Sequence, residues 1–532
     1  MRAKNKISTE KIEQLISNLG SVIRYYENTE KLLDGMLIDV FYNDIIAKSG
    51  RIERLLKPTR KDINKTVVGA RFSDAADGLE NHIITYYLKR ETIEKTIKEL
   101  QEIKRFLDDK FAGEATAKEF NETRSKLNYN GYALEEKEIC NLIVDCSVVE
   151  KIARPDVRTE VRDENFLVTF YKTEQSVSEI LEKIKVDRTY MYSFYGEDTI
   201  SVTKDLYAYI AEKIPYMISM VSADLSKISY QEIEPETEKE TIIIPGPTIE
   251  PTIGVIDTLF DEQVYFTKWV DNRDCLDIYE RGQVREEHRI HGTQVSSLIV
   301  DGPRLNPWLD DGCGRFRVRH FGVCLNRISV SRLVKKIKDI VNENPDIHVW
   351  NLSLGTDEEV SKNFISFDAA VLDELQAKKN VIFVVAGTND SRSEKKGTLR
   401  IGSPADSLNA VVVNSVRRDG RPASYTRKGE VLSFFQKPDV SYYGGDYDEK
   451  INTYTPNGEW QDCGTSLAAP WISRKLAFLI DVMGMPREVA KALLIDSAAG
   501  WEYKIDTYKH QTLTGYGIVP IDIKNVMASE NS

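Results

Sequence analysis

The sequence predicts an α/β fold for the C-terminal half of this 532-residue chain: a doubly wound parallel sheet with helices on both faces, preceded by a mostly helical and mixed α/β N-terminal region. Two observations carry the prediction. Short, nearly continuous apolar runs recur beyond residue 250, as expected for strands that are buried on both faces of a sheet. Amphipathic stretches separate these runs, as expected for helices that connect parallel strands.

Residues 1–112 are predicted to be mostly helical. Apolar residues recur at helical spacing from Ile12 to Ile23, and a second apolar stripe runs from Ile93 to Leu107. The apolar run NHIITYYLK precedes the second stripe and indicates one strand pair. Residues 113–231 mix the strand-like segment FLVTFY with the helix-like segments SVSEILEKI and KDLYAYIAEKI. This second region carries no motif with chemistry, so the N-terminal half is interpreted as scaffold or interaction surface.

Residues 232–249 are predicted to be an acidic, proline-containing linker, in which five glutamates precede the prolines. The α/β domain follows over residues 250–524, and residues 525–532 form a C-terminal tail. The strand candidates of this domain are TIGVI, VRHFGVC, IHVWNLS, VIFVVA and AVVVNSV. Its helix candidates include SRLVKKIKDIVNEN and FDAAVLDELQAKK.

The composition excludes several classes of protein. The chain has 72 Lys and Arg against 84 Asp and Glu, a net charge of −12, and therefore lacks the basic excess of a nonspecific DNA-binding protein. It has no run of about 18 apolar residues and no apolar stretch behind its N-terminal basic residues. Its six cysteines form no C-x-x-C pair. These features predict a cytoplasmic protein with reduced thiols.

Three polar motifs lie next to the predicted elements. GVIDT places Asp257 at the carboxyl end of a strand, where ligands bind in open α/β sheets. HGTQVSSLI places His291 just ahead of a helix, and GTSLAAP places Ser466 at the start of another. A serine hydroxyl becomes a nucleophile only when a base takes its proton, and the base needs a third group that orients it. Asp257, His291 and Ser466 are the residue types that supply these roles.

In this chain order, GVIDT, HGT and GTSLAAP resemble the three signatures of the subtilisin-like serine peptidases. The resemblance covers residues 250–524. It implies a subtilisin-like fold and hydrolysis of a polypeptide substrate through an acyl-enzyme, with Asp257, His291 and Ser466 as catalytic residues and no cofactor. It also implies an oxyanion hole formed by the side chain of Asn389, within AGTND, and the backbone N–H of Ser466.

Weaker segments fit the same family. NLSLG resembles the strand that pairs with the substrate backbone and borders S1, the pocket for the substrate residue on the acyl side of the cleaved bond. GSPA resembles the loop that floors S1. The implied substrate-binding residues are Ser353, Leu354, Gly355, Gly387 and Gly402. Where the family usually has A-G-N, this chain has AGTN at 386–389, so either Thr388 replaces a glycine or one residue is inserted.

Two alternatives use the same residues differently. A catalytically silent protein of this fold would bind peptide or act as a scaffold, and reaction of Ser466 with a serine-directed probe distinguishes it from an enzyme. A metal site at His288 and His291, or at Cys313, His320 and Cys324, lacks a fourth ligand and zinc-type spacing, so no metal is predicted.

The predicted function is therefore that of an intracellular endopeptidase. Its long N-terminal half either regulates the enzyme and is retained, or inhibits it and is removed. More weakly, the layout and the segment VVGARFSDAADGLENHIITYYL resemble bacterial anti-phage serine peptidases encoded beside an AAA-type ATPase, which would be the partner. A housekeeping or peptide-maturation protease is the alternative.

Overall fold

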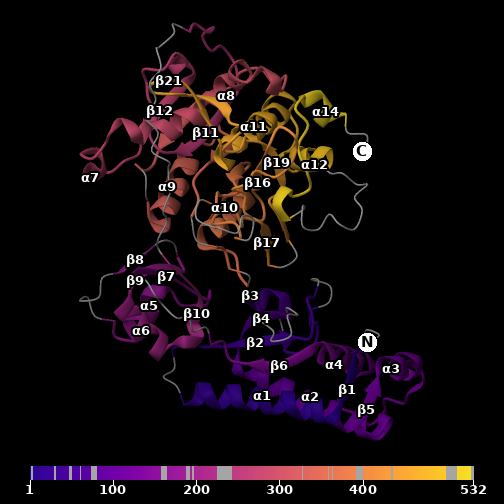
Figure 1. The fold of residues 1–532 in the computed structure, drawn as a ribbon. Coiled ribbons are helices and arrows are strands. Elements are labelled where there is room, and N and C mark those ends of the chain that lie inside the picture. The colour runs from indigo at the N-terminus through magenta and orange to yellow at the C-terminus, as the bar shows by residue number, and fades with distance from the viewer. Residues whose placement is uncertain are drawn as a thin grey trace. The chain divides into compact units, whose positions relative to one another are not determined.

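The computed structural model describes residues 1–532 except 2–3, 29–31, 47–50, 60–61, 74–80, 157–164, 187–191, 195–196, 224–241, 326–327, 357–358, 362, 391–398, 433–434, 499–511 and 529–532. The chain divides into two compact units, Met1–Ala223 and Asp224–Ser532 (Figure 1). Most of the predicted linker and the end of the predicted tail lie outside the described residues.

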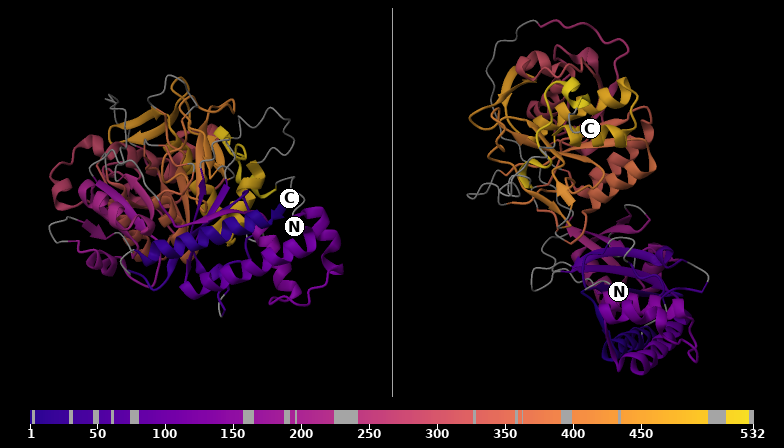
Figure 2. Two further views of the ribbon diagram at one scale, coloured as in Figure 1. Left: turned by 90° about the horizontal axis from the view of Figure 1, so that it is seen from below. Right: turned by 90° about the vertical axis from the view of Figure 1, so that its right-hand side faces the viewer.

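The first part of the N-terminal unit is a four-stranded antiparallel sheet packed against helices. The sheet has the order β3 (Val67–Ser73), β4 (Asn81–Leu88), β2 (Met36–Tyr42) and β6 (Val149–Ala153). The two apolar stripes form α1 (Thr9–Glu27) and α2 (Arg90–Phe111), as predicted, and these helices lie side by side (Figures 1 and 2). A short antiparallel pair joins β1 (Lys6–Ser8) to β5 (Glu114–Thr116), and α3 (Ala117–Thr123) and α4 (Glu136–Val148) follow.

The second part of this unit is another four-stranded antiparallel sheet. Its order is β10 (Ile218–Ala223), β7 (Asn165–Phe170), β9 (Thr199–Thr203) and β8 (Tyr192–Phe194), and its helices are α5 (Val177–Lys183) and α6 (Lys204–Lys213). Leu32, Leu33 and Leu37 from the first part are buried in the same core as these elements. The two sheets therefore share packing, and the segment before β2 belongs to both parts.

The C-terminal unit contains the predicted parallel sheet. Its seven strands have the order β12 (Val270–Asp274), β13 (Arg317–Gly322), β11 (Thr252–Asp257), β14 (Val349–Leu352), β15 (Ile382–Ala386), β16 (Val411–Val416) and β19 (Val440–Tyr443), and every neighbouring pair is parallel. All five apolar runs singled out in the sequence are strands of this sheet. The α/β prediction is thus confirmed.

Helices cover both faces of this sheet. On one face, α8 (Ile290–Leu305) and α11 (Thr465–Ala477) share a core with alternate strand residues such as Val255 and Val384. The intervening residues, including Trp350 and Phe383, point to the opposite face. There, Gln376 of α10 (Phe367–Lys378) accepts a hydrogen bond from the backbone of Phe383, and α9 (Val330–Glu343) packs against α10. The remaining helices are α7 (Ile278–Arg281), α12 (Arg487–Ala498) and α14 (Ile523–Met527).

Two hairpins lie outside the main sheet. β17 (Gly429–Val431) pairs with β18 (Phe435–Lys437), and β20 (Ile451–Thr455) pairs with β21 (Gly458–Asp462). The second hairpin positions functional residues, because β21 leads within a few residues into the start of α11.

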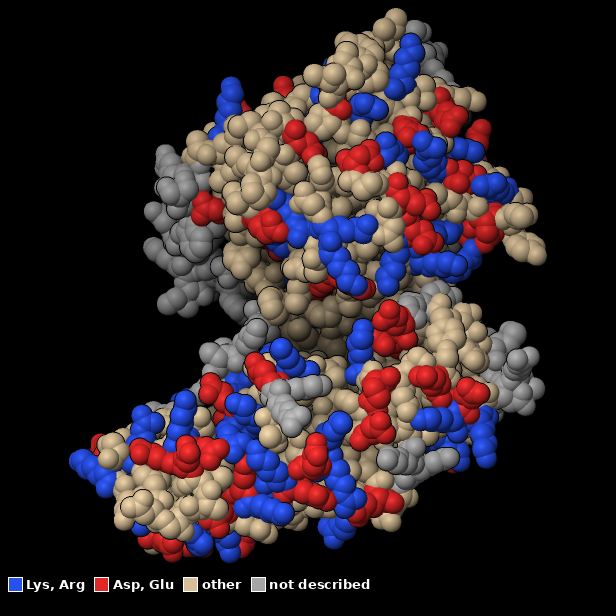
Figure 3. Space-filling view, turned by 180° about the vertical axis from the view of Figure 1, so that it is seen from behind, with Lys and Arg blue, Asp and Glu red and all other residues tan. Residues whose placement is uncertain are grey.

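Two surface properties bear on partners. Figure 3 shows acidic and basic side chains interspersed over the face that it displays. Within the described residues, every helix is too short or too polar to cross a membrane.

Candidate active site

The site begins with the carboxylate at the end of β11. Asp257 is fully buried, and its Oδ1 accepts a hydrogen bond from the backbone N–H of Thr258 at 2.7 Å. Next to it, the Thr258 hydroxyl accepts a hydrogen bond from Gly292 N at 3.1 Å, which ties the strand end to the first turn of α8. The carboxylate is thereby fixed toward that helix before any substrate binds.

His291 lies in this first turn of α8. Its Nδ1 donates to Asp257 Oδ1 at 2.6 Å, so Nε2 is the nitrogen that remains basic. Its side chain is 14% exposed. Burial opposes the charged imidazolium, but the charge and hydrogen bond of Asp257, together with the charge of Asp462, raise the pKa of His291 above the usual histidine value. An oriented and strengthened base of this kind is what proton removal from a hydroxyl requires.

Close packing explains the glycine that follows His291. A Cβ atom on Gly292 would lie 2.6 Å from Leu259 O and 2.7 Å from Thr258 O. Only glycine lets α8 approach the end of β11 closely enough for the contact between Asp257 and His291. Behind this junction His320 is buried, with Nε2 donating to Thr258 O at 2.7 Å. Burial lowers the pKa of His320, which favours a neutral supporting residue.

Ser466 and Asn389 face the same space beside Gly464. A Cβ atom on Gly464 would lie 3.2 Å from Ser466 Oγ and 3.3 Å from Asn389 Nδ2, so both atoms are close to one point. Asn389 Oδ1 accepts hydrogen bonds from Thr465 N at 3.1 Å and from Thr465 Oγ1 at 2.9 Å. Because its oxygen is held this way, the Asn389 amide presents its N–H₂ group to the space beside the serine hydroxyl.

The predicted substrate-binding residues lie around this point. Ser353 follows β14, and its hydroxyl donates to Ser466 O at 3.2 Å, while Leu354 is buried. A Cβ on Gly355 would meet Thr388 Cγ2 at 2.6 Å, and Gly402 N donates to Thr388 Oγ1 at 2.9 Å. Gly387 packs directly on Asn414, whose Oδ1 would lie 1.9 Å from an added Cβ. Gly387 therefore has a packing role in the sheet.

Thr388 adopts φ of 66°, in the left-handed region that a β-branched residue rarely enters. The residue occupies a backbone conformation that glycine favours, as expected if it replaces the glycine of the A-G-N pattern.

Sequence reasoning missed Asp462, Gln294 and Thr465 as site residues. Gln294, one turn after His291 in α8, donates from Nε2 to Asp462 Oδ2 at 3.0 Å. This contact holds the segment that leads to Ser466 against the helix that carries His291. A carboxylate just ahead of GTS was the available signal in the sequence. Burial above all, with the nearby carboxylates, raises the pKa of the intervening Cys463 thiol to about 12, which disfavours the nucleophilic thiolate form.

Three of the residues considered as metal ligands, His288, His320 and Cys313, have other partners. His288 Nδ1 accepts from Arg285 N at 3.0 Å, and His320 lies between Ser296 and Thr258. Cys313 is buried, with Sγ 3.7 Å from Asp311 O. Among the residues that the structure describes, no cluster of three or more His, Cys, Asp or Glu side chains is arranged to hold a metal ion.

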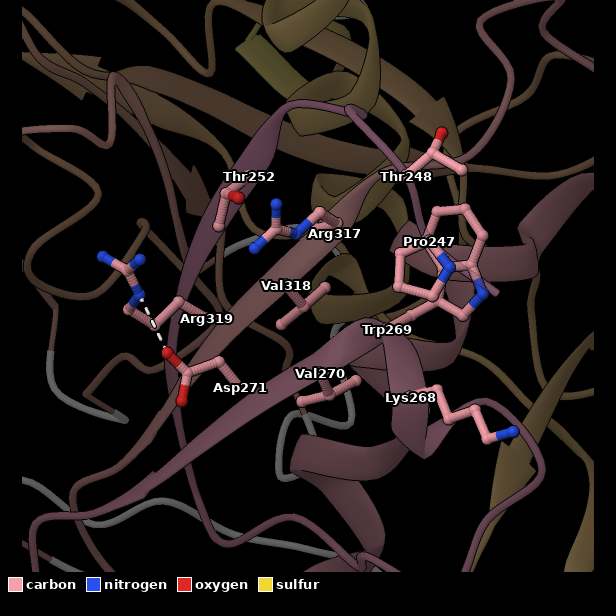
Figure 4. A pocket seen from close by; sticks show the side chains of 10 residues that line it. All are labelled: Pro247, Thr248, Thr252, Lys268, Trp269, Val270, Asp271, Arg317, Val318 and Arg319. Carbon is pink, nitrogen blue, oxygen red and sulfur yellow. Dashed lines mark hydrogen bonds and ion pairs between the residues drawn. The ribbon is translucent and has the colours of Figure 1, made fainter. Parts of the chain in front are cut away.

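A separate pocket of about 350 Å³ lies at the opposite, amino-terminal ends of β11, β12 and β13 (Figure 4). Its lining includes Lys268, Trp269 and Arg317, and Arg319 donates to Asp271 within it at 3.2 Å. None of the predicted catalytic or substrate-binding residues lines this pocket.

Comparison with solved structures finds peptide-processing and peptide-maturation proteases at low similarity. The epidermin leader peptide processing serine protease EpiP from Staphylococcus aureus is 17% identical, with a TM-score of 0.46, over 70% of this chain and 100% of that one. The prenylagaramide maturation protease PagA is 20% identical, with a TM-score of 0.39, over 52% of this chain and 92% of that one. The patellamide maturation protease PatA is 20% identical, with a TM-score of 0.39, over 52% of this chain and 95% of that one.

No curated protein sequence matches the chain. A sequence model of the subtilase family, peptidase S8, matches residues 225–518, which is more than half of the chain and includes every site residue described above. The chain therefore belongs to the subtilase family of serine proteases.

Proposed function

We propose that the chain is an endopeptidase in which Ser466 is the nucleophile, His291 the general base and Asp257 the group that orients the base. The observation that carries the proposal is the 2.6 Å hydrogen bond from His291 to the buried Asp257, because it fixes the tautomer with a basic Nε2. The shared space of Ser466 Oγ and Asn389 Nδ2 beside Gly464 supports it further.

The proposed reaction uses these groups in the following steps. His291 Nε2 takes the proton of Ser466 Oγ as the oxygen bonds to the carbonyl carbon of a peptide. The oxyanion that forms accepts hydrogen bonds from Asn389 Nδ2 and from Ser466 N–H at the positive end of α11. Expulsion of the amine leaving group takes the proton from His291 and leaves an acyl-enzyme. Water then hydrolyses the acyl-enzyme, giving its proton to His291, and Ser466 recovers a proton as it leaves.

Fluorophosphonate labelling of the full chain tests this proposal. Wild type, Ser466→Ala and His291→Ala are treated side by side, and the adduct is mapped by mass spectrometry. We expect a single adduct on Ser466 that is lost in both variants. Ser473→Ala, which removes another hydroxyl from the same helix, is the matched control and should keep the adduct. Folded wild type that never reacts would instead favour a catalytically silent peptide-binding protein.

We further propose that the N-terminal unit is a regulatory module that stays attached to the working enzyme. Its support is its size, since Met1–Ala223 forms a compact unit with its own sheets and buried cores. Intact-mass measurement of purified wild type and Ser466→Ala tests it. Equal masses of the full chain, with Ser466 still reactive toward the probe, are expected. A wild-type chain that begins near residues 232–249 would make the unit a removable inhibitor.

A cytoplasmic AAA-type ATPase is the partner that we propose for this module, in a bacterial anti-phage system. Affinity purification of Ser466→Ala from its native host, with and without phage infection, tests the idea. Recovery of an ATPase encoded beside this gene is the expected result. Its absence from both samples, with unchanged phage growth in a Ser466→Ala strain, would favour the housekeeping or peptide-maturation alternative.

A further inference from the structure

The strained residue Thr388 lies directly before the Asn389 that faces Ser466. Its φ of 66° is costly for a threonine, and such strain persists only where the surroundings hold it in place. Backbone outliers of this kind cluster at ligand-binding positions, so the contacts of the Thr388 side chain need a physical explanation.

The Thr388 side chain fills the space between Gly355 and Gly402. Its hydroxyl donates to Gly387 O at 2.7 Å and accepts from Gly402 N at 2.9 Å, so it is fixed on the Gly402 loop. Its methyl group, Cγ2, lies against Gly355, where an added Cβ would come within 2.6 Å. Thr388 and Gly355 are both half-buried, so this contact borders solvent. The methyl thus occupies space that the two glycines would leave open.

This filled space lies next to the reacting atoms. A carbonyl carbon bonded to Ser466 Oγ, with its oxygen at Asn389 Nδ2, has its α-carbon substituent within a few ångströms of the same groups. The segment that starts at Ser353 flanks the position, because Ser353 Oγ donates to Ser466 O at 3.2 Å. Thr388 flanks it too, being bonded to Asn389. These contacts put Gly355 and the loop held by Thr388 beside the position that the substrate side chain on the acyl side of the cleaved bond would take.

We propose that Thr388 restricts this position to small substrate residues, so that the chain cleaves after glycine, alanine or serine. The inference rests on the proposed peptidase function and adds its substrate class. The methyl group is the obstacle, and the hydroxyl holds the methyl in place by linking it to Gly402. A side chain as large as leucine or phenylalanine would collide with Thr388 Cγ2, unless the strained segment at residues 387–389 moved.

Three substitutions at Thr388 separate these two parts of the side chain. Thr388→Ser removes the methyl group and keeps both hydrogen bonds of the hydroxyl. Thr388→Val keeps the branched shape but loses both hydrogen bonds. Thr388→Gly removes the whole side chain and relieves the backbone strain. Each full-length variant is assayed on peptides that differ only at the acyl-side residue, alanine or phenylalanine. We expect the serine and glycine variants to raise kcat/KM for phenylalanine relative to alanine by roughly 10- to 200-fold, as for one methylene-sized change in a pocket. Valine should leave the ratio near that of wild type.

A binding experiment separates this inference from the proposed activity. In the Ser466→Ala background, peptides ending in alanine or phenylalanine are titrated with and without Thr388→Ser, and the same gain for phenylalanine is expected. If Thr388→Ser strengthens binding of the phenylalanine peptide but wild type cleaves neither peptide, the peptidase proposal is overturned and the role of Thr388 is kept. A wild type that prefers phenylalanine, or an alanine-to-phenylalanine ratio that Thr388→Ser leaves unchanged, would overturn the role of Thr388 while the enzyme stays active.

Discussion

Asp462 is a second carboxylate that influences His291, in addition to its hydrogen-bonded partner Asp257. In the proposed mechanism neutral His291 takes the serine proton, so we expect activity to fall on the acid side as pH drops through the pKa of His291. The charge of Asp462 stabilises the imidazolium and raises this pKa. We therefore expect Asp462→Asn to lower the pKa of His291. The acid limb of the pH profile, where activity falls at low pH, should then move to lower pH. The second-order rate of fluorophosphonate labelling, measured from pH 5 to 9, reports this limb without a substrate.

Glu459→Gln is the matched control for Asp462→Asn, because it removes one carboxylate charge from the same strand, β21. Glu459 pairs with Arg304 at a half-exposed position. The control should leave the acid limb in place. A limb that moved to higher pH in Asp462→Asn, or that moved equally in both variants, would contradict the role given to Asp462.

Asn389 provides a second prediction for a single residue. Asn389→Ala removes the Nδ2 donor beside Ser466, and we expect kcat to fall by about 10²–10³, or about 2.7–4 kcal/mol, with little change in KM. Asn389→Asp tests the charge, because it keeps the acceptor for Thr465 but places a negative group where the oxyanion forms. We expect the kcat of Asn389→Asp to be no higher than that of Asn389→Ala. Near-normal kcat in the alanine variant would remove Asn389 from the mechanism.

Single residues were predictable from the sequence where the chemistry itself requires a residue type. Asp257, His291 and Ser466 lie in three motifs at predicted strand and helix ends, and the structure places Asp257 in contact with His291. The roles proposed for Asp462 and Thr388 were not predictable, because they depend on contacts across the fold. Those contacts, to Gln294 in one case and to Gly355 in the other, join residues from different elements.

At the scale of elements, α11 carries Ser466 at its start and a buried ion pair two turns later. Arg474 and Asp311 are both fully buried and form two hydrogen bonds of 2.8 Å. Burial alone would raise the pKa of Asp311, yet the guanidinium holds it below its usual range. Arg474 also donates to the carbonyl oxygens of Ile299 and Gly314. These bonds connect α11 to α8 and to the segment before β13.

We expect Asp311→Ala to destabilise the C-terminal unit by about 3–5 kcal/mol, because it leaves a buried guanidinium without its counterion. All six tryptophans lie in this unit, so urea unfolding followed by tryptophan fluorescence measures its free energy of unfolding. Asp419→Ala, which breaks an exposed pair with Arg421, is the control and should change little. Equal effects of both substitutions would show that α11 is anchored by other contacts.

Elements were predictable wherever burial leaves an apolar signature. Four of the five inner strands of the sheet are mostly apolar runs, and helix α9 has a clear apolar stripe. The edge strand β12 was missed because its sequence, VDNRD, is charged. An edge strand is not covered on both sides, and charge there prevents pairing with other chains. Its strand conformation comes from pairing with β13, which the local sequence does not encode.

At the scale of the whole molecule, the N-terminal unit has the contacts of a self-sufficient domain. Its first core combines residues between Ile7 and Ile152, and its second combines Leu32, Leu33 and Leu37 with residues between Phe166 and Val221. The buried Asp39 also finds its cation inside the unit, in Arg71. The predicted boundary near residue 231 lies close to the end of this unit at Ala223, and the boundary predicted at residues 112–113 lies between β1 and its partner β5.

We therefore expect residues 1–223, expressed alone, to fold and to unfold in a cooperative transition by far-UV circular dichroism, with dispersed amide signals by NMR. Residues 1–112 serve as the comparison, since this fragment lacks β5, α4 and β6 and exposes the apolar faces that these elements cover. It should melt without a transition or aggregate. If residues 1–112 folded cooperatively, or if residues 1–223 did not, the two cores would not form one folding unit.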